Sequence, residues 1–175
     1  MSASFTITSA AFLVPLAFII SYYDICYRRI PNPFVLATLV VGFFLNVAFG
    51  GAYGALSSLG GCALAFFLMF ILHIFGAMGA GDVKLFAAIG SIMGANLVLP
   101  MFVVVILVGG VLGVISMLRA DQVKLSMMRV MHIVVGLLPG HRVPRFAVPS
   151  DRKLTIPYGV AITFGSLLSL VLFHH

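Results

Sequence analysis

Four carboxylic acids are the only acidic side chains in this 175-residue chain, and all four are aspartates: Asp24, Asp82, Asp121 and Asp151. The absence of glutamate excludes the HExxH metalloprotease motif and every glutamate-based acid or base. Two carboxyl groups that lie close together do not both ionise easily, so they share a proton. One carboxylate then acts as general base on a water, and the other donates a hydrogen bond to a carbonyl oxygen. A pair of these aspartates would therefore suffice for peptide hydrolysis without a metal, serine or cysteine.

The rest of the chain indicates that such a pair would work in a membrane. Hydrophobic residues make up 62% of the sequence and charged residues only 8%, whereas a soluble domain carries about 25% charged residues. No basic residue precedes the first apolar stretch, so we interpret that stretch as a retained membrane helix and not as a signal peptide. Cys26 and Cys62 have no metal-ligand or CxxC spacing and are interpreted as small apolar side chains.

A membrane-crossing helix needs about 20 apolar residues, and we expect an all-α protein with six transmembrane helices. The expected spans are Phe5–Tyr23, Pro33–Phe49, Leu56–Gly76, Val83–Ala95, Leu97–Leu118 and Leu154–Phe173. Gly94, Asn96 and Pro100 predict a tight turn between the fourth and fifth spans. Residues 1–175 are expected to form a single integral membrane domain. Residues of about 119–153 are interpreted as a cytoplasmic loop, either with an amphipathic interfacial helix or as a solvated basic loop.

The basic residues predict the orientation of these spans. All ten lysines and arginines fall on the side of the loops after the first, third and fifth spans, with Lys84 at the edge of the fourth span counted there, and the opposite loops hold none. By the positive-inside rule this basic side is cytoplasmic and both termini lie outside. We expect the protein in the bacterial cytoplasmic membrane, with its basic loop against anionic lipid.

Asp24 ends the first expected span and Asp82 begins the fourth, so both acids lie at the cytoplasmic edge. A helix N-terminus favours a negative charge and a C-terminus disfavours one. On this ground we expect Asp82 to be the ionised base and Asp24 the protonated partner, although Arg28 at i+4 could reverse the roles by pairing with Asp24. Taken singly, a boundary aspartate is more often a helix cap or an ion-pair partner; that interpretation suits Asp121 and Asp151.

The residues beside the two acids have roles of their own. Glycines in Gly79-Ala80-Gly81-Asp82 are expected to let the backbone turn sharply and approach a substrate strand. The segment Ile30-Pro31-Asn32-Pro33 breaks the chain after Asp24 and would stiffen the loop that follows the first acid.

Three motifs resemble those of one family. Gly79 to Leu85 reads GAGDVKL and is similar to the GxGDxKL signature of the type IV prepilin peptidases, which are membrane aspartyl proteases. Asp24 followed by Arg29-Ile30-Pro31-Asn32 resembles the first-aspartate motif of that family. Ile156 to Ile162 reads IPYGVAI and resembles its C-terminal P-[FY]-G-x-A motif. The three motifs occur in the family's order and span nearly the whole chain.

The resemblance implies an aspartic endopeptidase that removes the short basic leader of prepilins at the cytoplasmic face, with Asp24 and Asp82 as its catalytic pair. Residues implied to bind substrate or shape the site are Gly79, Gly81, Lys84, Arg29, Pro31, Asn32, Pro157 and Gly159. No cofactor or metal is implied. The small size resembles the Tad/Flp-pilus branch. The paired CxxC motifs of larger members are missing from this sequence, so N-methyltransferase activity is not expected.

Other functions leave different signatures. An archaeal-type preflagellin peptidase would use the same chemistry. A transporter needs polar groups near the bilayer midplane. His73 is the one histidine within an expected span, and we interpret it as a satisfied core residue. A non-enzymatic assembly protein would tolerate asparagine at both aspartate positions. Lys84 and Ser91 stand seven residues apart on one helix, too far for a Ser–Lys dyad. The basic loop lacks the interleaved aromatics of nucleic-acid binding.

Overall fold

A computed structural model describes residues 3–76, 78–119 and 158–173 of the chain. In these ranges every regular element is a helix, which confirms the all-α prediction. The expected interfacial segment, Asp121, Asp151, Pro157 and the first residues of the last expected span lie outside the described residues. Residues 3–76, 78–109 and 158–173 belong to one compact unit, while residues 110–119 belong to a second one.

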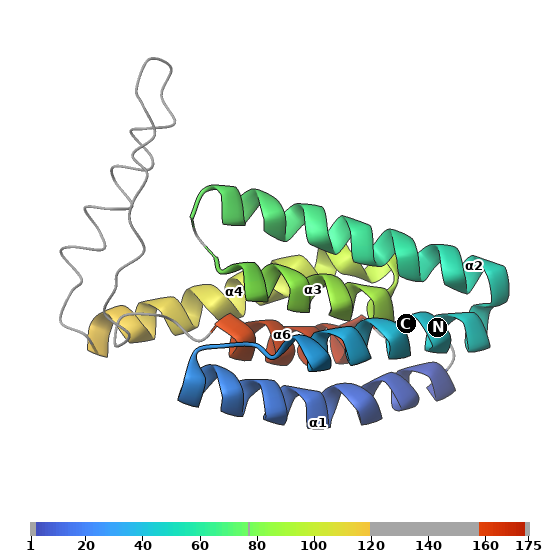
Figure 1. Ribbon diagram of the computed structural model, residues 1–175, viewed down its shortest axis with the longest axis horizontal. Helices are drawn as coiled ribbons and strands as arrows, with labels where there is room; N and C mark the ends of the chain where they lie inside the picture. The colour runs from blue at the N-terminus through green and yellow to red at the C-terminus, as the bar shows by residue number, and fades with distance from the viewer. Residues whose placement is uncertain (1–2, 77, 120–157, 174–175) are drawn as a thin grey trace, which may run out of the picture. The chain divides into compact units, whose positions relative to one another are not determined.

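The first two helices differ from the expected spans in their bounds. Helix α1 covers Ala3–Tyr27 and is longer than expected at its C-terminal end, so Asp24 lies inside its last turn. Helix α2 covers Asn32–Ile74 and takes the place of two expected helices. It is broken at Gly51, whose φ of 56° and ψ of −136° are not helical. The part after Gly51 runs back antiparallel to the part before it (Figure 1).

Three further helices complete the described chain. Helix α3 covers Ala80–Met93 and helix α4 covers Ala95–Arg119, with only Gly94 between them. The predicted turn is therefore a single residue with a positive φ of 74°, where glycine is favoured. Pro100 lies inside α4 and not in the turn, which corrects the expectation that it helps to separate the two helices. Helix α6 covers Tyr158–Leu172.

Three of these helices are long and apolar enough to cross a membrane, namely over Ser4–Tyr27, Asn32–Ile74 and Ala95–Ile115. Helix α2, with 43 residues, is about twice as long as one crossing requires. Helices α3 and α6 have 14 and 15 residues and are shorter than a full crossing. The chain is thus a helical membrane protein, and the six crossings stay a prediction.

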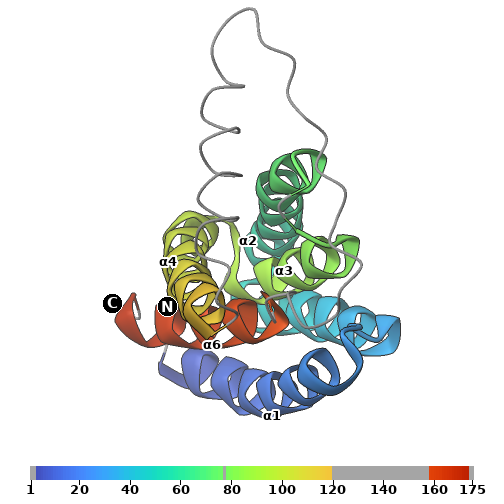
Figure 2. The ribbon, with the colours of Figure 1, turned by 90° about the vertical axis from the view of Figure 1, so that its left-hand side faces the viewer.

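Helix α3 lies at the centre of the packing and is buried on nearly all sides from Leu85 to Met93. It packs against both parts of α2 and against α6. At its crossing with α2, a Cβ added at Gly90 would stand 2.7 Å from the Gly61 carbonyl oxygen, so the two backbones touch. Helix α6 packs against α1 as well as α3, and Figures 1 and 2 show it beside α1 in both views.

Candidate active site

Three helix ends meet at one end of the compact unit. Because successive helices run antiparallel, the C-terminus of α1 lies at the same end as the N-termini of α3 and α6 (Figure 1). Asp24 is in the last turn of α1 and Asp82 in the first turn of α3. Gly159 is in the first turn of α6, which packs against both of those helices. The three sequence motifs therefore converge, although they are far apart along the chain.

Asp24 is buried against the start of α6, with 8% of its surface exposed. The backbone N–H of Gly159 donates a hydrogen bond to Asp24 Oδ2 at 2.8 Å, and the backbone N–H of Val160 also favours the ionised carboxylate. A Cβ added at Gly159 would stand only 2.9 Å from Oδ2, closer than real Cβ contacts. Glycine at this position therefore lets the helix N-terminus reach the acid.

Asp82 is held by its own helix and lies outside the three long apolar helices. Its Oδ2 accepts a hydrogen bond from the Gly79 N–H at 3.1 Å, which caps the start of α3. Burial and the negative charge of Asp24 raise the pKa of Asp82 to about 6, against a smaller lowering by the Gly79 N–H. The two carboxyl groups are thus near enough to influence each other's ionisation.

The electrostatic environment of Asp24 differs from the one expected from the sequence. The sequence shows only the C-terminus of Asp24's own helix, which disfavours a negative charge. In the structure the carboxylate faces the N-terminus of α6, whose N–H groups favour an anion. Arg28, four residues on, adds a positive charge that acts on Asp24. Both acids therefore lie at helix N-termini, and the expected difference between them disappears.

The glycines before Asp82 serve a different purpose from the one expected from the sequence. Neither Gly79 nor Gly81 has a positive φ; the sharp turn is made at Gly76, with a φ of 74°. A Cβ at Gly79 would stand 3.2 Å from Asp82 Oδ2, so this glycine makes room for the acid. A Cβ at Gly81 would make an ordinary contact, 3.6 Å from Ile30.

The other predicted site residues are less closely involved. Lys84, Arg29 and Asn32 are exposed, and the cation that acts on Asp24 is Arg28 and not Arg29. Pro31 precedes the first residue of α2, and its carbonyl accepts a hydrogen bond from the Phe34 N–H at 3.2 Å. Arg29 and Pro31 lie in the loop between α1 and α2, Asn32 begins α2, and Lys84 lies on α3. Their part in substrate binding stays a prediction.

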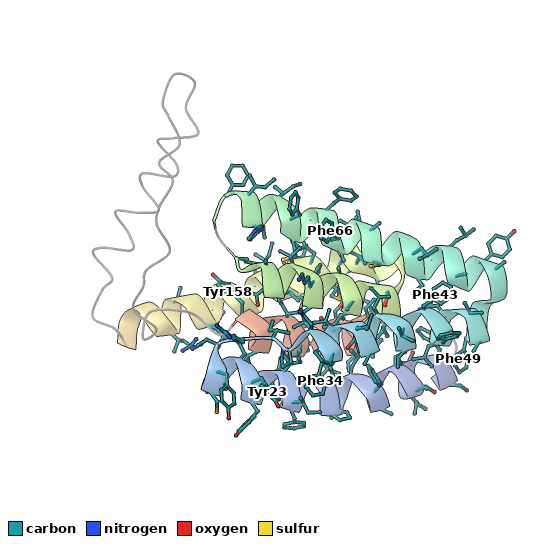
Figure 3. The ribbon with its side chains drawn as sticks, in the orientation of Figure 1. Tyr23, Phe34, Phe43, Phe49, Phe66 and Tyr158 are labelled. Atoms are coloured by element: carbon teal, nitrogen blue, oxygen red, sulfur yellow. The ribbon has the colours of Figure 1, made fainter. Side chains whose placement is uncertain are left out.

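Two side chains near the acids were not assigned a site role from the sequence. The Tyr158 phenol lies within electrostatic range of Asp82, and Figure 3 shows this side chain at the start of α6. The only signal was its place in the motif, where tyrosine and phenylalanine both occur. His73 Nδ1 lies 2.8 Å from the carbonyl oxygen of Met78, so it ties the end of α2 to the loop that leads to Asp82.

A comparison with protein families shows which family has this arrangement of motifs. The family model of the type IV leader peptidases matches residues 11–114, which is more than half of the chain and includes Asp24 and Asp82. The chain belongs to the type IV leader peptidase family. This confirms the resemblance found in the motifs and makes the protein a protease of the leader peptidase type. No curated protein and no solved structure matches the chain.

The match ends before α6, so the third motif is supported by another kind of observation. Gly159 lies outside residues 11–114, yet its N–H binds the first acid of the leader peptidase. This contact is independent of the family match. It makes the first turn of α6 part of the candidate active site.

Proposed function

We propose that this leader peptidase is a membrane aspartyl endopeptidase whose catalytic pair is Asp24 and Asp82. One observation carries the proposal. Two acids 58 positions apart influence each other's ionisation at one end of the helical unit, where Asp24 is buried and Asp82 is half-buried. Buried acids that interact are rare unless they have a function. A pair that served only as helix caps would be more stable as neutral amides.

The proposed reaction is hydrolysis of one peptide bond by a water. The ionised carboxylate takes a proton from the water, whose oxygen attacks the scissile carbonyl carbon. The protonated carboxyl group donates its hydrogen bond to the carbonyl oxygen, where negative charge develops. Breaking of the C–N bond then returns the proton from the first acid to the leaving amine. The pair ends with one proton, as it began.

The site is proposed to lie at the cytoplasmic surface of the membrane. Three aromatic residues, Tyr22, Tyr23 and Tyr27, gather around Asp24 at the end of α1, with ring centroids 5.6 to 6.2 Å apart. Tyrosine is enriched where a helix leaves the hydrocarbon. Figure 3 shows Tyr23 at this end, where its ring packs against Phe34 at 5.8 Å. The basic residues of the same end, with the others on the predicted cytoplasmic side, favour a bacterial inner-membrane protein that faces the cytoplasm.

The substrate is proposed to be a prepilin-like precursor. The family implies a short basic leader followed by a hydrophobic helix, and a Flp-type pilin is the proposed member of this class. Such a substrate would place its apolar helix in the lipid and its basic leader at the surface. The scissile bond would then stand at the depth of the two acids.

The chain offers its own controls for a test, because it has only four acids. Wild type and the four single variants Asp24→Asn, Asp82→Asn, Asp121→Asn and Asp151→Asn are co-expressed with a candidate Flp-type prepilin. The mass of the pilin then reports whether the leader was removed. Asp24→Asn and Asp82→Asn are expected to lower processing by at least about 1000-fold, since each removes one half of the pair.

Asp121→Asn and Asp151→Asn are expected to process the precursor at the wild-type rate. The folding of every variant is checked by its thermal unfolding in detergent micelles. Normal processing by Asp24→Asn or Asp82→Asn would refute the catalytic assignment. An archaeal-type preflagellin is assayed in parallel, and its exclusive cleavage would move the proposal to that substrate.

A further inference from the structure

We propose that the first turn of α6 divides the roles of the two acids, so that Asp24 is the ionised base and Asp82 carries the shared proton. The proposal rests on the catalytic pair assigned above and reverses the roles that the chain's own helix ends predict. Gly159 is then a positioning residue, because it acts through Asp24 and touches no substrate.

The two carboxylates differ in the donors that face them. Asp24 accepts a hydrogen bond from the Gly159 N–H of α6 at 2.8 Å, and the backbone N–H of the next residue, Val160, also favours its ionised form. Asp82 accepts one, from Gly79, at the longer distance of 3.1 Å. Hydrogen bonds from N–H groups stabilise an ionised carboxylate more than a protonated carboxyl group, which accepts such bonds only at its carbonyl oxygen. The acid with the shorter N–H bond, Asp24, is therefore proposed to keep the negative charge.

The charged neighbours act in the same direction. Asp24 interacts with the positive charge of Arg28, the residue that follows α1, and with the carboxyl group of Asp82 on α3. Asp82 feels the negative charge of Asp24 and lies within range of the neutral Tyr158 phenol of α6. No cation among the described residues is found to act on Asp82 as Arg28 acts on Asp24. Among the described residues, a cation therefore acts on Asp24 and none acts on Asp82.

Sterics explain why α6 reaches Asp24 in the first place. A side chain at Gly159 would meet Asp24 Oδ2 at 2.9 Å, Asp24 Cγ at 3.2 Å and Ile20 Cγ2 at 3.2 Å. Replacement by alanine must therefore move the carboxylate or the helix end, and the 2.8 Å bond to the N–H lengthens or breaks. Gly159→Ala is predicted to weaken the asymmetry between the two acids while both stay in place.

The small number of acids makes the protonation of each one measurable. Protein labelled with carbon-13 at the side-chain carboxyl of aspartate gives four resonances, because the chain has four aspartates and no glutamate. Each resonance is assigned in detergent micelles by its loss in one Asp→Asn variant. We expect the Asp82 resonance to titrate at a pH of about 6. The chemical shift of the Asp24 resonance should stay at the value of an ionised carboxylate over the pH range in which Asp82 titrates.

Two other outcomes would overturn the proposal. If the Asp24 resonance titrates near neutral pH while Asp82 stays ionised, Asp82 is the base and Asp24 carries the shared proton. If both resonances move together in one step, the proton is shared equally and α6 does not divide the roles.

Gly159→Ala tests the part played by α6, and Gly165→Ala on the same helix is its matched control. A Cβ at Gly165 would crowd the backbone of Val105 on α4, far along α6 from the acids. Gly165→Ala should lower the thermal stability and leave both titrations unchanged. Gly159→Ala should bring the two titrations closer together, and unchanged titrations would overturn the role of α6. The titrations are measured without substrate. Failure of prepilin cleavage would therefore refute the proposed function without changing the result of the titrations.

Discussion

The two ends of helix α3 hold buried polar groups of opposite character. At its N-terminus are two carboxyl groups, and burial together with the charge of Asp24 raises the pKa of Asp82 to about 6. At its C-terminus is a neutral amide, Asn46, whose side-chain nitrogen lies 2.9 to 3.1 Å from the carbonyl oxygens of Gly42, Ser91 and Ile92. The Ser58 hydroxyl donates a further bond to the Ser91 carbonyl at 2.9 Å. The two carbonyls of α3 belong to its last turn, which lacks helical partners.

The difference separates a structural site from a functional one. At the C-terminal end, donors from α2 satisfy the backbone groups that would otherwise be left unpaired in an apolar surrounding. At the N-terminal end, two acids are kept close although they repel each other when ionised. A fold selected for stability alone would remove that repulsion. Mutations at the two ends should therefore change stability in opposite directions.

The largest effect on stability is expected from Asn46→Leu, which keeps the approximate volume and removes the donors. The bonds to Ser91 and Ile92 each contribute about 1 kcal/mol, and the Ile92 carbonyl is left without its side-chain donor, while the Ser91 carbonyl keeps the Ser58 hydroxyl. We expect a loss of about 3 kcal/mol, measured as a lower thermal midpoint in detergent micelles. The folded fraction should keep its cleavage rate, because Asn46 lies at the other end of α3 from the acids.

Thr38→Val is the control for Asn46→Leu. The Thr38 hydroxyl is also buried, but it donates only to the Phe34 carbonyl of its own helix, four residues back. Its removal leaves the helical backbone bonds in place, so a change of no more than about 1 kcal/mol is expected. Equal losses for Asn46→Leu and Thr38→Val would show that the cluster at the end of α3 is not a special anchor.

Asp82→Asn should have the opposite sign. The pKa of Asp82 is about 6 in the folded protein, against an ordinary value of 3.8 for an aspartate. The folded state therefore binds the proton more tightly, and stability falls as pH rises from about 4 to about 6. Asparagine cannot ionise, so Asp82→Asn should raise stability at neutral pH by at most about 3 kcal/mol.

Thermal midpoints of wild type and Asp82→Asn at pH 4.5 and pH 7.5 check this sign. The gain should be small at the lower pH, where wild-type Asp82 is protonated, and larger at the higher one. Asp121→Asn, which replaces an acid outside the described residues, serves as a comparison at both pH values. A destabilised Asp82→Asn at pH 7.5 would contradict the idea that function, and not stability, keeps an acid at this end of α3.

The sequence predicted one of these two ends much better than the other. Apolar runs and the distribution of lysines and arginines placed Asp24 and Asp82 at one end, and the family match confirms the resemblance of their motifs. Asn46 gave no signal, because an amide within an apolar run does not reveal which carbonyls it will meet. Those carbonyls, of Ser91 and Ile92, lie 45 and 46 residues further along the chain.

The premise behind the predicted roles of the acids was wrong for the same reason. The sequence indicates which helix an aspartate belongs to. The Gly159 N–H that faces Asp24, however, belongs to another helix and lies 135 residues further along the chain. A backbone donor also has no residue type to recognise. Only the absence of a side chain at Gly159 indicated a close contact. The break at Gly51 and the turn at Gly94, in contrast, fall where the sequence predicted connections between expected spans, and only their shortness was not predicted.

The smallest effect concerns strain at the acid end. Arg28 has a φ of 53°, in the left-handed region that disfavours side chains, and its N–H donates to the Asp24 carbonyl at 3.1 Å. Arg28→Gly and Arg28→Ala both remove the charge that acts on Asp24, but only glycine relieves the backbone. Arg28→Gly should therefore be more stable than Arg28→Ala by about 1 kcal/mol, measured by thermal unfolding. Strain of this size is typical of functional sites, and equal stability of the two variants would show that the acid end holds no backbone strain at this position.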